Sequence, residues 1–267
     1  MKIAKKILFI LASLVLMLAS VFPTAASRGE NDASYSWYVK RNKEHKQPTL
    51  DAAQATAEKQ GAYYVDRKHG DGETEKVVYL TFDAGYENGN IQKILDTLRE
   101  EDVKAAFFVL KHLILKEPQL VTRMGDEGHL VCNHTANHKD MSACSKEEFV
   151  SEIQTLETVY KEHIGREIEK YYRPPEGKYS EDNLKQIQKM GYKTVFWSLA
   201  YADWDNDRQP APEKAKKILL DNLHNGAVLL LHPTSSTNAA ILGDLIRTLK
   251  SEGYRFGNLH ELCGGTA

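Results

Sequence analysis

Several residues of this 267-residue chain have side chains suited to activating water and transferring protons. In chain order they are Asp83, His134 with His138, Arg173, Asp203 and His232. Carboxylates and imidazoles are common general bases and general acids at neutral pH, and an arginine beside a carboxylate keeps the carboxylate ionised. Taken singly, each residue also fits an ordinary structural role, such as a turn or a helix cap. Their positions in the fold therefore decide whether they form a site.

Two catalytic classes use some of these residue types. His134 and His138 have the spacing of the metalloprotease motif, but that motif needs a glutamate after the first histidine, and Thr135 stands there. A metal site of another kind, formed by these two histidines, remains an alternative. A glycosidase needs two opposed carboxylates, for which Asp83 and Asp203 are the obvious pair. That interpretation leaves the arginine and the last histidine without a role.

The chain from residue 76 onward alternates between β-rich runs and helical patterns. Strands are expected over 77–82, 105–110, 129–133, 171–173, 194–199, 227–231 and 254–256, and helices over 88–101, 118–127, 145–163, 180–190, 213–224 and 238–252. About seven such units predict an α/β fold with a parallel sheet covered by helices, either closed into a barrel or doubly wound.

The candidate residues follow the expected strands directly. Asp83 comes after 77–82, His134 after 129–133, Arg173 ends 171–173, Asp203 comes after 194–199, and His232 comes after 227–231. In parallel α/β folds, functional groups lie at the carboxyl ends of the strands. The sequence therefore predicts that these side chains meet at one end of the sheet.

The first 74 residues have a different composition from the rest. A basic start with three lysines, an apolar run over 7–22 and small residues over 23–27 predict a signal peptide over 1–26, with an uncleaved anchor as the alternative. Residues 27–48 are polar and are expected to form a linker or a loosely attached arm, followed by a helix over 50–60 and a strand over 62–66. The predicted organisation is therefore a leader, an extension over 27–74 and a catalytic domain over 75–263.

The overall composition excludes several partners. The chain has 35 Lys and Arg against 37 Asp and Glu, a net charge of −2, and 42% hydrophobic residues. This balance gives no basis for nucleic-acid binding, and three cysteines do not make a disulfide framework. We expect a monomeric, secreted protein of the cell wall that binds neither nucleic acid nor, after removal of the leader, a membrane.

Five motifs carry a resemblance to a known family. They are TFDAGY at residues 81–86, HTANH at 134–138, RPPEG at 173–177, Asp203 with Trp204, and LLH at 230–232. In this order they resemble the polysaccharide deacetylase family, which is carbohydrate esterase family 4 with its NodB-homology domain, over about residues 75–260. The resemblance implies a distorted (β/α)7 barrel and hydrolysis of an N-acetyl group from an amino sugar.

The resemblance also implies residue roles. Asp83 matches the catalytic base, Arg173 the arginine that holds it, and His232 the catalytic acid, while Asp203 belongs to the fourth motif. His134 and His138 match two metal-binding histidines. The substrate-binding residues implied by the motifs and their flanks are Tyr86, Asn88, Pro174, Glu176, Trp204 and Leu230. A backbone N–H at Glu176 is expected to bind the oxyanion.

Two departures from the family pattern narrow the prediction. Ala84 replaces the usual aspartate ligand, so a divalent metal (Zn, Mn or Co) is expected to bind weakly. Ala200 takes the place of an aspartate that tunes the catalytic histidine. These losses resemble the spore-cortex subgroup, which deacetylates N-acetylmuramic acid in peptidoglycan glycan strands and leads to muramic δ-lactam. The alternatives are an N-acetylglucosamine or chitin-oligomer deacetylase and a catalytically inactive glycan-binding homologue.

Overall fold

A computed structural model describes residues 33–264 of the chain. These residues belong to one compact unit, Asp32–Ala267. The expected leader over 1–26 lies outside the described residues. None of the described helices has the length and apolar character needed to span a membrane.

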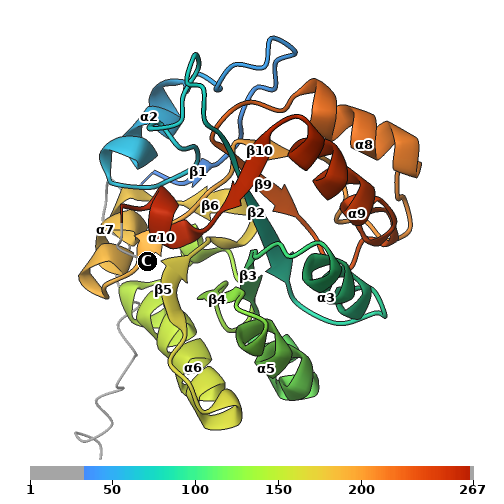
Figure 1. Ribbon diagram of the computed structural model, residues 1–267. Helices are drawn as coiled ribbons and strands as arrows, with labels where there is room; N and C mark the ends of the chain where they lie inside the picture. Colours follow the sequence, from blue (N-terminus) through green and yellow to red (C-terminus); the bar gives the residue numbers. More distant parts are fainter. Residues whose placement is uncertain (1–32, 265–267) are drawn as a thin grey trace, which may run out of the picture. The chain divides into compact units, whose positions relative to one another are not determined.

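The centre of this unit is a parallel β-sheet, shown in Figure 1. Its strands run in the order β7-β5-β4-β3-β2-β9-β8, and β10 pairs with β2 as well. The strands are β2 (Lys76–Ala84), β3 (Ala106–Val109), β4 (Leu130–Asn133), β5 (Glu169–Tyr172), β7 (Lys193–Thr194), β8 (Leu199–Ala200), β9 (Ala227–Leu231) and β10 (Tyr254–Gly257). Strand β10 pairs with the first half of β2, and β3 pairs with the second half.

The sheet curls so that its two edges are linked by one short segment of the chain. Strands β7 and β8 stand at opposite ends of the strand order, yet only residues 195–198 separate them. The Val195 amide donates to the Tyr172 carbonyl next to one edge, and the Ser198 amide donates to the Val228 carbonyl at the other. The expected continuous strand over 194–199 is therefore wrong, because its backbone is shared between the two edges. The predicted distorted barrel is confirmed.

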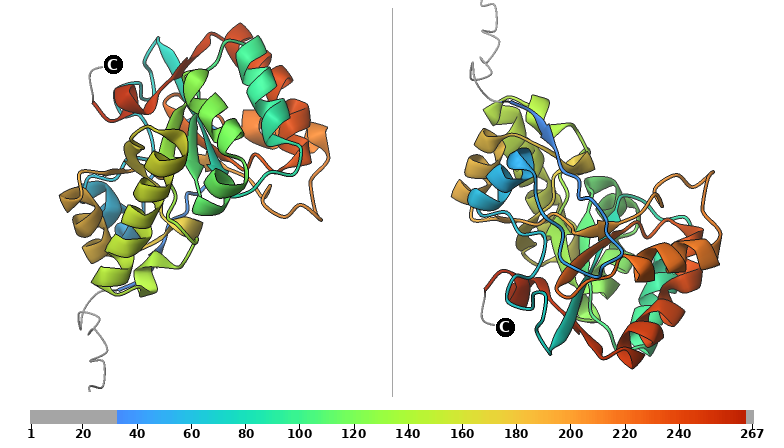
Figure 2. Two further views of the ribbon diagram at one scale, coloured as in Figure 1. Left: turned by 90° about the horizontal axis from the view of Figure 1, so that it is seen from below. Right: turned by 90° about the horizontal axis from the view of Figure 1, so that it is seen from above.

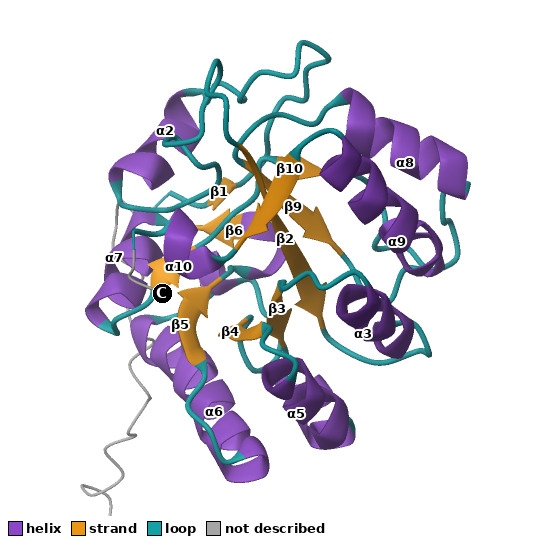
Figure 3. Cartoon of the chain, in the orientation of Figure 1, coloured by secondary structure: helices purple, strands orange, loops and turns teal. Residues whose placement is uncertain are grey.

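Helices surround the sheet, as Figures 1 and 3 show. They are α2 (Ala52–Lys59), α3 (Ile91–Glu100), α4 (Lys111–Lys116), α5 (Pro118–Asp126), α6 (Lys146–Ile164), α7 (Glu181–Lys189), α8 (Pro212–Asp221), α9 (Ser236–Ser251) and α10 (Leu259–Leu262). Helix α6 begins with a capping box between Ser145 and Glu148 and ends at Gly165, whose φ of 75° is left-handed. The short helices α4 and α10 were not predicted, because they are too short to show a periodic pattern.

The core follows the alternation of side chains along the strands. Val78, Leu80 and Phe82 of β2 pack in the large cluster with the helices, whereas Val77 and Tyr79 pack in the second cluster on the other face of the sheet. Both faces of β2 are thus buried, which explains its nearly continuous apolar sequence.

The segment before α2 is not the loosely attached arm that its composition predicts. Trp37 is only 4% exposed, and β1 (Tyr35–Ser36) pairs antiparallel with β6 (Lys178–Tyr179). Figure 2 shows the described start of the chain running along the unit. The expected strand over 62–66 forms only isolated bridges, from Tyr63 to Val195 and from Val65 to Ala227.

Candidate active site

Arg173 and Asp83 form a buried ion pair at the carboxyl ends of β5 and β2. The Arg173 Nη1 atom donates to Asp83 Oδ1 at 2.8 Å. Its Nε and Nη2 atoms donate to the carbonyls of Val195 (2.9 Å) and Phe196 (3.1 Å), and the guanidinium lies 4.2 Å from the ring centroid of Phe108. Because three acceptors and an aromatic face hold the guanidinium, it fixes the carboxylate in one orientation.

The environment of Asp83 keeps its carboxyl group ionised. Burial alone raises the pKa, but the charges of Arg173, His134 and His232 act in the opposite direction and leave the pKa below its usual range. The side chain remains 9% exposed. An ionised and oriented carboxylate with access to solvent is what a general base requires.

His134 presents one ring nitrogen to Asp83. Its Nδ1 atom lies 2.8 Å from the Arg173 carbonyl, which only accepts, so Nδ1 carries the proton. Its Nε2 atom lies 3.6 Å from Asp83 Oδ2. Burial lowers the pKa of His134 to about 4, so the ring is neutral at neutral pH and Nε2 has a free lone pair.

The loop from His134 to His138 is held in a strained backbone conformation. Thr135 and His138 have φ values of 74° and 56°, which non-glycine residues rarely adopt. The buried Glu152 of α6 accepts hydrogen bonds from the Asn137 amide and the Asn137 side chain, both at 2.8 Å. Sequence reasoning missed Glu152, although an acidic residue on the apolar face of a helix was the available signal.

Asp203 holds His232 at the end of β9. Asp203 Oδ1 lies 2.8 Å from His232 Nδ1, and Oδ2 accepts from the His232 amide at 2.8 Å and from Asn238 at 2.6 Å. Burial lowers the pKa of His232, but the hydrogen bond and charge of Asp203 outweigh it and raise the pKa above its usual value. The expectation that Ala200 marks a lost acidic partner is therefore wrong, because Asp203 supplies that partner. Asn238 was not predicted.

Metal-ligating groups are fewer here than in a typical catalytic zinc site. The rings of His134 and His138 lie 5.1 Å apart, but Ala84 offers a fully buried methyl group. No group of three or more His, Cys, Asp or Glu suited to a metal occurs in residues 33–264. A catalytic zinc site usually has three protein ligands. Among the described residues of this site, the side chains suited to bind a divalent ion are therefore the imidazoles of His134 and His138.

Comparisons with known proteins agree with this geometry. The model of the family described as polysaccharide deacetylase matches residues 70–195. The peptidoglycan-N-acetylmuramic acid deacetylase PdaA of Bacillus subtilis is 40% identical over 231 residues, which cover 85% of each chain. The chain belongs to the polysaccharide deacetylase family. The prediction of a carbohydrate deacetylase is thereby confirmed at the level of the family.

Solved structures show the same relationship. The structure of B. subtilis PdaA, a family 4 carbohydrate esterase, has a TM-score of 0.80 and 36% identity, covering 86% of this chain and 96% of that one. A family 4 carbohydrate esterase from Bacillus anthracis has a TM-score of 0.71 and 35% identity, covering 88% of this chain and 98% of that one.

Two of the predicted substrate-binding residues of this deacetylase are exposed aromatic residues. Trp204 is 63% exposed, and its ring centroid lies 6.4 Å from that of His232. Tyr86 is 45% exposed, and its hydroxyl accepts a hydrogen bond from Asn206. Exposed aromatic rings at the edge of a site are suited to contact with the apolar faces of sugars.

The other predicted substrate-binding residues differ in exposure. Asn88 is exposed, and its side chain donates to the Thr234 carbonyl at 2.8 Å. Glu176 is exposed, with a left-handed φ of 55°, and its carboxylate pairs with Lys178 at 2.8 Å. Pro174 and Leu230 are buried.

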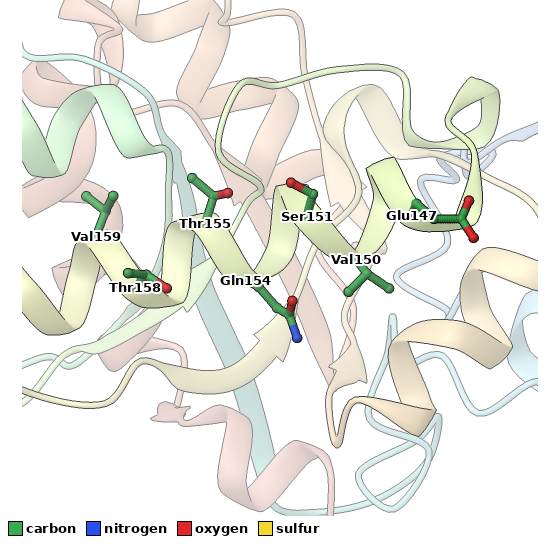
Figure 4. Close-up of a pocket in the computed structure, with 7 residues that line it drawn as sticks. All are labelled: Glu147, Val150, Ser151, Gln154, Thr155, Thr158 and Val159. Atoms are coloured by element: carbon green, nitrogen blue, oxygen red, sulfur yellow. The ribbon is translucent and has the colours of Figure 1, made fainter. Parts of the chain in front are cut away.

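A hollow of about 350 Å³ lies elsewhere, along helix α6, and is shown in Figure 4. It is lined by Glu147, Val150, Ser151, Gln154, Thr155, Thr158 and Val159. This lining contains one carboxylate and no histidine or arginine, so it lacks the paired acid and base found at the carboxyl ends of the strands. None of the candidate catalytic residues lines it.

Proposed function

We propose that this protein removes the N-acetyl group from N-acetylmuramic acid in peptidoglycan glycan strands. The observation that carries the proposal is the pairing of an ionised Asp83, fixed by Arg173, with a His232 whose pKa is raised by Asp203. The substrate class is supported by the 40% identity to a relative named as a peptidoglycan-N-acetylmuramic acid deacetylase.

In the proposed reaction, Asp83 takes a proton from water, and the oxygen attacks the acetyl carbonyl. The backbone N–H of Glu176 donates to the oxyanion that forms. Protonated His232 gives its proton to the departing nitrogen, so that the C–N bond breaks into acetate and a free amine. Tyr86, Asn88 and Trp204 contact the sugar, and Leu230 and Pro174 shape the acetyl side.

Any divalent ion at this site, such as Zn²⁺, Mn²⁺ or Co²⁺, is held in our proposal by His134 and His138 alone. The orientation of His134, with Nδ1 bonded to a carbonyl and Nε2 free, supports this role. When bound, such an ion would polarise the substrate carbonyl. With two protein ligands, it is expected to exchange readily.

The proposal extends to the location and the product. We propose that residues 1–26 direct export and that the protein acts as a monomer in the cell wall, including the spore cortex. The amine set free on muramic acid is next to the lactyl carboxyl group of the same sugar. Where an amidase has removed the stem peptide and left that carboxyl free, attack of the amine on it, with loss of water, gives the muramic δ-lactam.

Mass spectrometry of peptidoglycan incubated with the protein tests this function. The glycans are used with and without prior amidase treatment, with a chelator or with added Zn²⁺, Mn²⁺ or Co²⁺. Acetate release and a δ-lactam after amidase treatment are the expected result. Acetate release only from N-acetylglucosamine or chitin oligomers would overturn the substrate in favour of the broader alternative. No acetate from any substrate would favour an inactive glycan-binding protein.

A further inference from the structure

Trp37 lies in the segment before the matched family region, yet it is built into the same core as the active-site loops. The residue is 4% exposed and packs in a cluster with Tyr64, Tyr179 and Phe196. Its ring stacks on that of Phe196, with centroids 4.3 Å apart and planes at 13°. The family model matches residues 70–195, and Tyr179 of this cluster lies within that range, so the cluster joins the extension to the matched region of the chain.

Trp37 also forms hydrogen bonds to two separate segments. Its amide donates to the Gly177 carbonyl at 2.8 Å, and its indole Nε1 atom donates to the Trp197 carbonyl at 2.9 Å. Gly177 ends the loop that begins at Arg173, and Trp197 belongs to the segment that links the two edges of the sheet. Trp37 therefore joins these two segments, through its backbone amide to Gly177 and through its indole ring to Trp197.

The same two segments hold the catalytic ion pair. The carbonyls of Val195 and Phe196 accept hydrogen bonds from Arg173, and Arg173 donates to Asp83. Phe196 thus contacts Trp37 through its ring and Arg173 through its carbonyl. The path from Trp37 to the Asp83 carboxylate passes through only Phe196 and Arg173.

Gly177 shows how closely these groups approach. Its φ is 66°, and a Cβ atom there would lie 2.8 Å from the Trp197 ring and 3.1 Å from the Trp37 Cβ atom. Only a glycine fits such contacts at this backbone conformation. The last residue of the RPPEG motif is therefore explained in part by the approach of Trp37.

We propose that Trp37 is a positioning residue of the active site, which fixes the backbone of residues 195–197 and thereby the Arg173 guanidinium that orients Asp83. Without the indole ring, Phe196 loses its stacking partner and the Trp197 carbonyl loses its donor. The carbonyls that hold Arg173 are then free to shift, and small displacements of catalytic groups reduce turnover strongly. The inference rests on the proposed roles of Asp83 and Arg173.

The first test compares Trp37→Ala and Trp37→Phe with Tyr160→Ala. Tyr160 of α6 is a buried aromatic residue with 3% exposure that packs in the large cluster away from Trp37, so its variant controls for a general loss of packing. We expect kcat for acetate release to fall about 10- to 100-fold in Trp37→Ala with KM nearly unchanged. Trp37→Phe, which keeps an aromatic ring, should recover part of this loss, and Tyr160→Ala should retain the wild-type kcat.

A double-mutant cycle with Arg173→Lys tests the route of the effect. If Trp37 acts through Arg173, Trp37→Ala should cost much less in the Arg173→Lys background than in the wild type. Equal losses in both backgrounds would overturn the proposed route. A wild-type kcat in Trp37→Ala, or an equal loss in Tyr160→Ala, would overturn the positioning role.

Hydrogen exchange provides a readout that does not depend on activity. Trp37→Ala should speed exchange of the amides in residues 174–179 and 193–198, and Tyr160→Ala should not. If Trp37→Ala does not fold, Trp37→Phe is measured in the same way. Unchanged exchange in these segments would overturn the inference. If the wild type releases no acetate from any substrate, the proposed function fails, while the exchange data still decide whether Trp37 holds these segments.

Discussion

The two ends of the sheet each contain an aspartate–histidine pair of nearly the same geometry. At the amino ends of the strands, Asp66 Oδ2 lies 2.7 Å from His69 Nδ1. At the carboxyl ends, Asp203 Oδ1 lies 2.8 Å from His232 Nδ1. In both histidines, burial lowers the pKa, but nearby carboxylates outweigh it and raise the pKa above its usual value: Asp66 with Glu75 act on His69, and Asp203 with Asp83 act on His232.

The two pairs differ in what the second ring nitrogen contacts. His69 Nε2 lies 3.2 Å from Glu75, and the Tyr79 hydroxyl donates to Asp66 at 2.5 Å. The His69 side chain is only 5% exposed, whereas that of His232 is 26% exposed. Across residues 33–264, no hydrogen bond involves His232 Nε2.

This difference separates a structural pair from a pair suited to catalysis. A histidine bonded through both nitrogens stabilises the fold but has no nitrogen available to a substrate. A histidine held through Nδ1 alone is oriented, has a raised pKa, and can give its Nε2 proton to a leaving group. The same two residue types therefore do different work, depending on their remaining contacts.

The largest expected effect comes from replacing one aspartate at each end of the sheet by asparagine and comparing the two variants. Asp83→Asn removes the proposed base, and kcat for acetate release should fall by about 10²- to 10⁴-fold. Asp66→Asn, the matched control, should lower the melting temperature and leave kcat close to that of the wild type. A normal kcat in Asp83→Asn, with the fold verified by circular dichroism, would contradict the assignment of the base.

A smaller effect is expected from Glu152→Gln, which acts on the loop of His134 and His138. The carboxylate accepts two hydrogen bonds from Asn137 and pairs with Lys139 at 3.2 Å. A glutamine places an NH₂ group where these donors point, so the loop should shift and kcat/KM should fall about 10- to 100-fold. The comparison variant is Glu147→Gln on the outer face of α6, which should behave like the wild type. Equal kinetics in both variants would show that Glu152 does not position the loop.

The effect of His69→Gln should appear in stability rather than in turnover. Loss of a buried hydrogen-bond partner costs about 1–3 kcal/mol, which lowers the melting temperature by about 2–4 °C for each kcal/mol. Because the pKa of His69 is raised above 6.5, its charge-dependent stabilisation is complete below that value and is lost as the pH rises through the folded-state pKa. The melting-temperature difference from the wild type, measured by calorimetry, should therefore shrink between pH 6 and pH 9. A difference that grows with pH would contradict the charged state of His69.

Much of the site could be predicted because the strand pattern is local. Asp83 and His232 follow apolar runs directly, and parallel strands bring their carboxyl ends together. The helix over 145–163 was also predictable, since Ser145 and Glu148 are close in sequence. These features depend on neighbouring residues, and the structure describes them near the expected positions.

The features that could not be predicted depend on contacts between distant parts of the chain. Trp37 bonds to a carbonyl 160 positions away, and the polar residues around it gave no pattern that marks it as buried. The expected strand over 194–199 is interrupted because Val195 bonds toward one edge of the sheet and Ser198 bonds toward the other. The partnership of Asp203 with His232, across 29 positions, corrected the interpretation of Ala200, since a position in a motif does not fix which side chain reaches the histidine.

The pH profile of kcat/KM in the wild type and in Asp203→Asn tests the central claim most directly. With Asp83 ionised and His232 protonated in the active form, the wild-type profile should be bell-shaped, with its alkaline limb set by His232. Asp203→Asn removes the charge that raises the His232 pKa, so that limb should move to lower pH. An alkaline limb that stays in place would contradict the assignment of His232 as an acid tuned by Asp203.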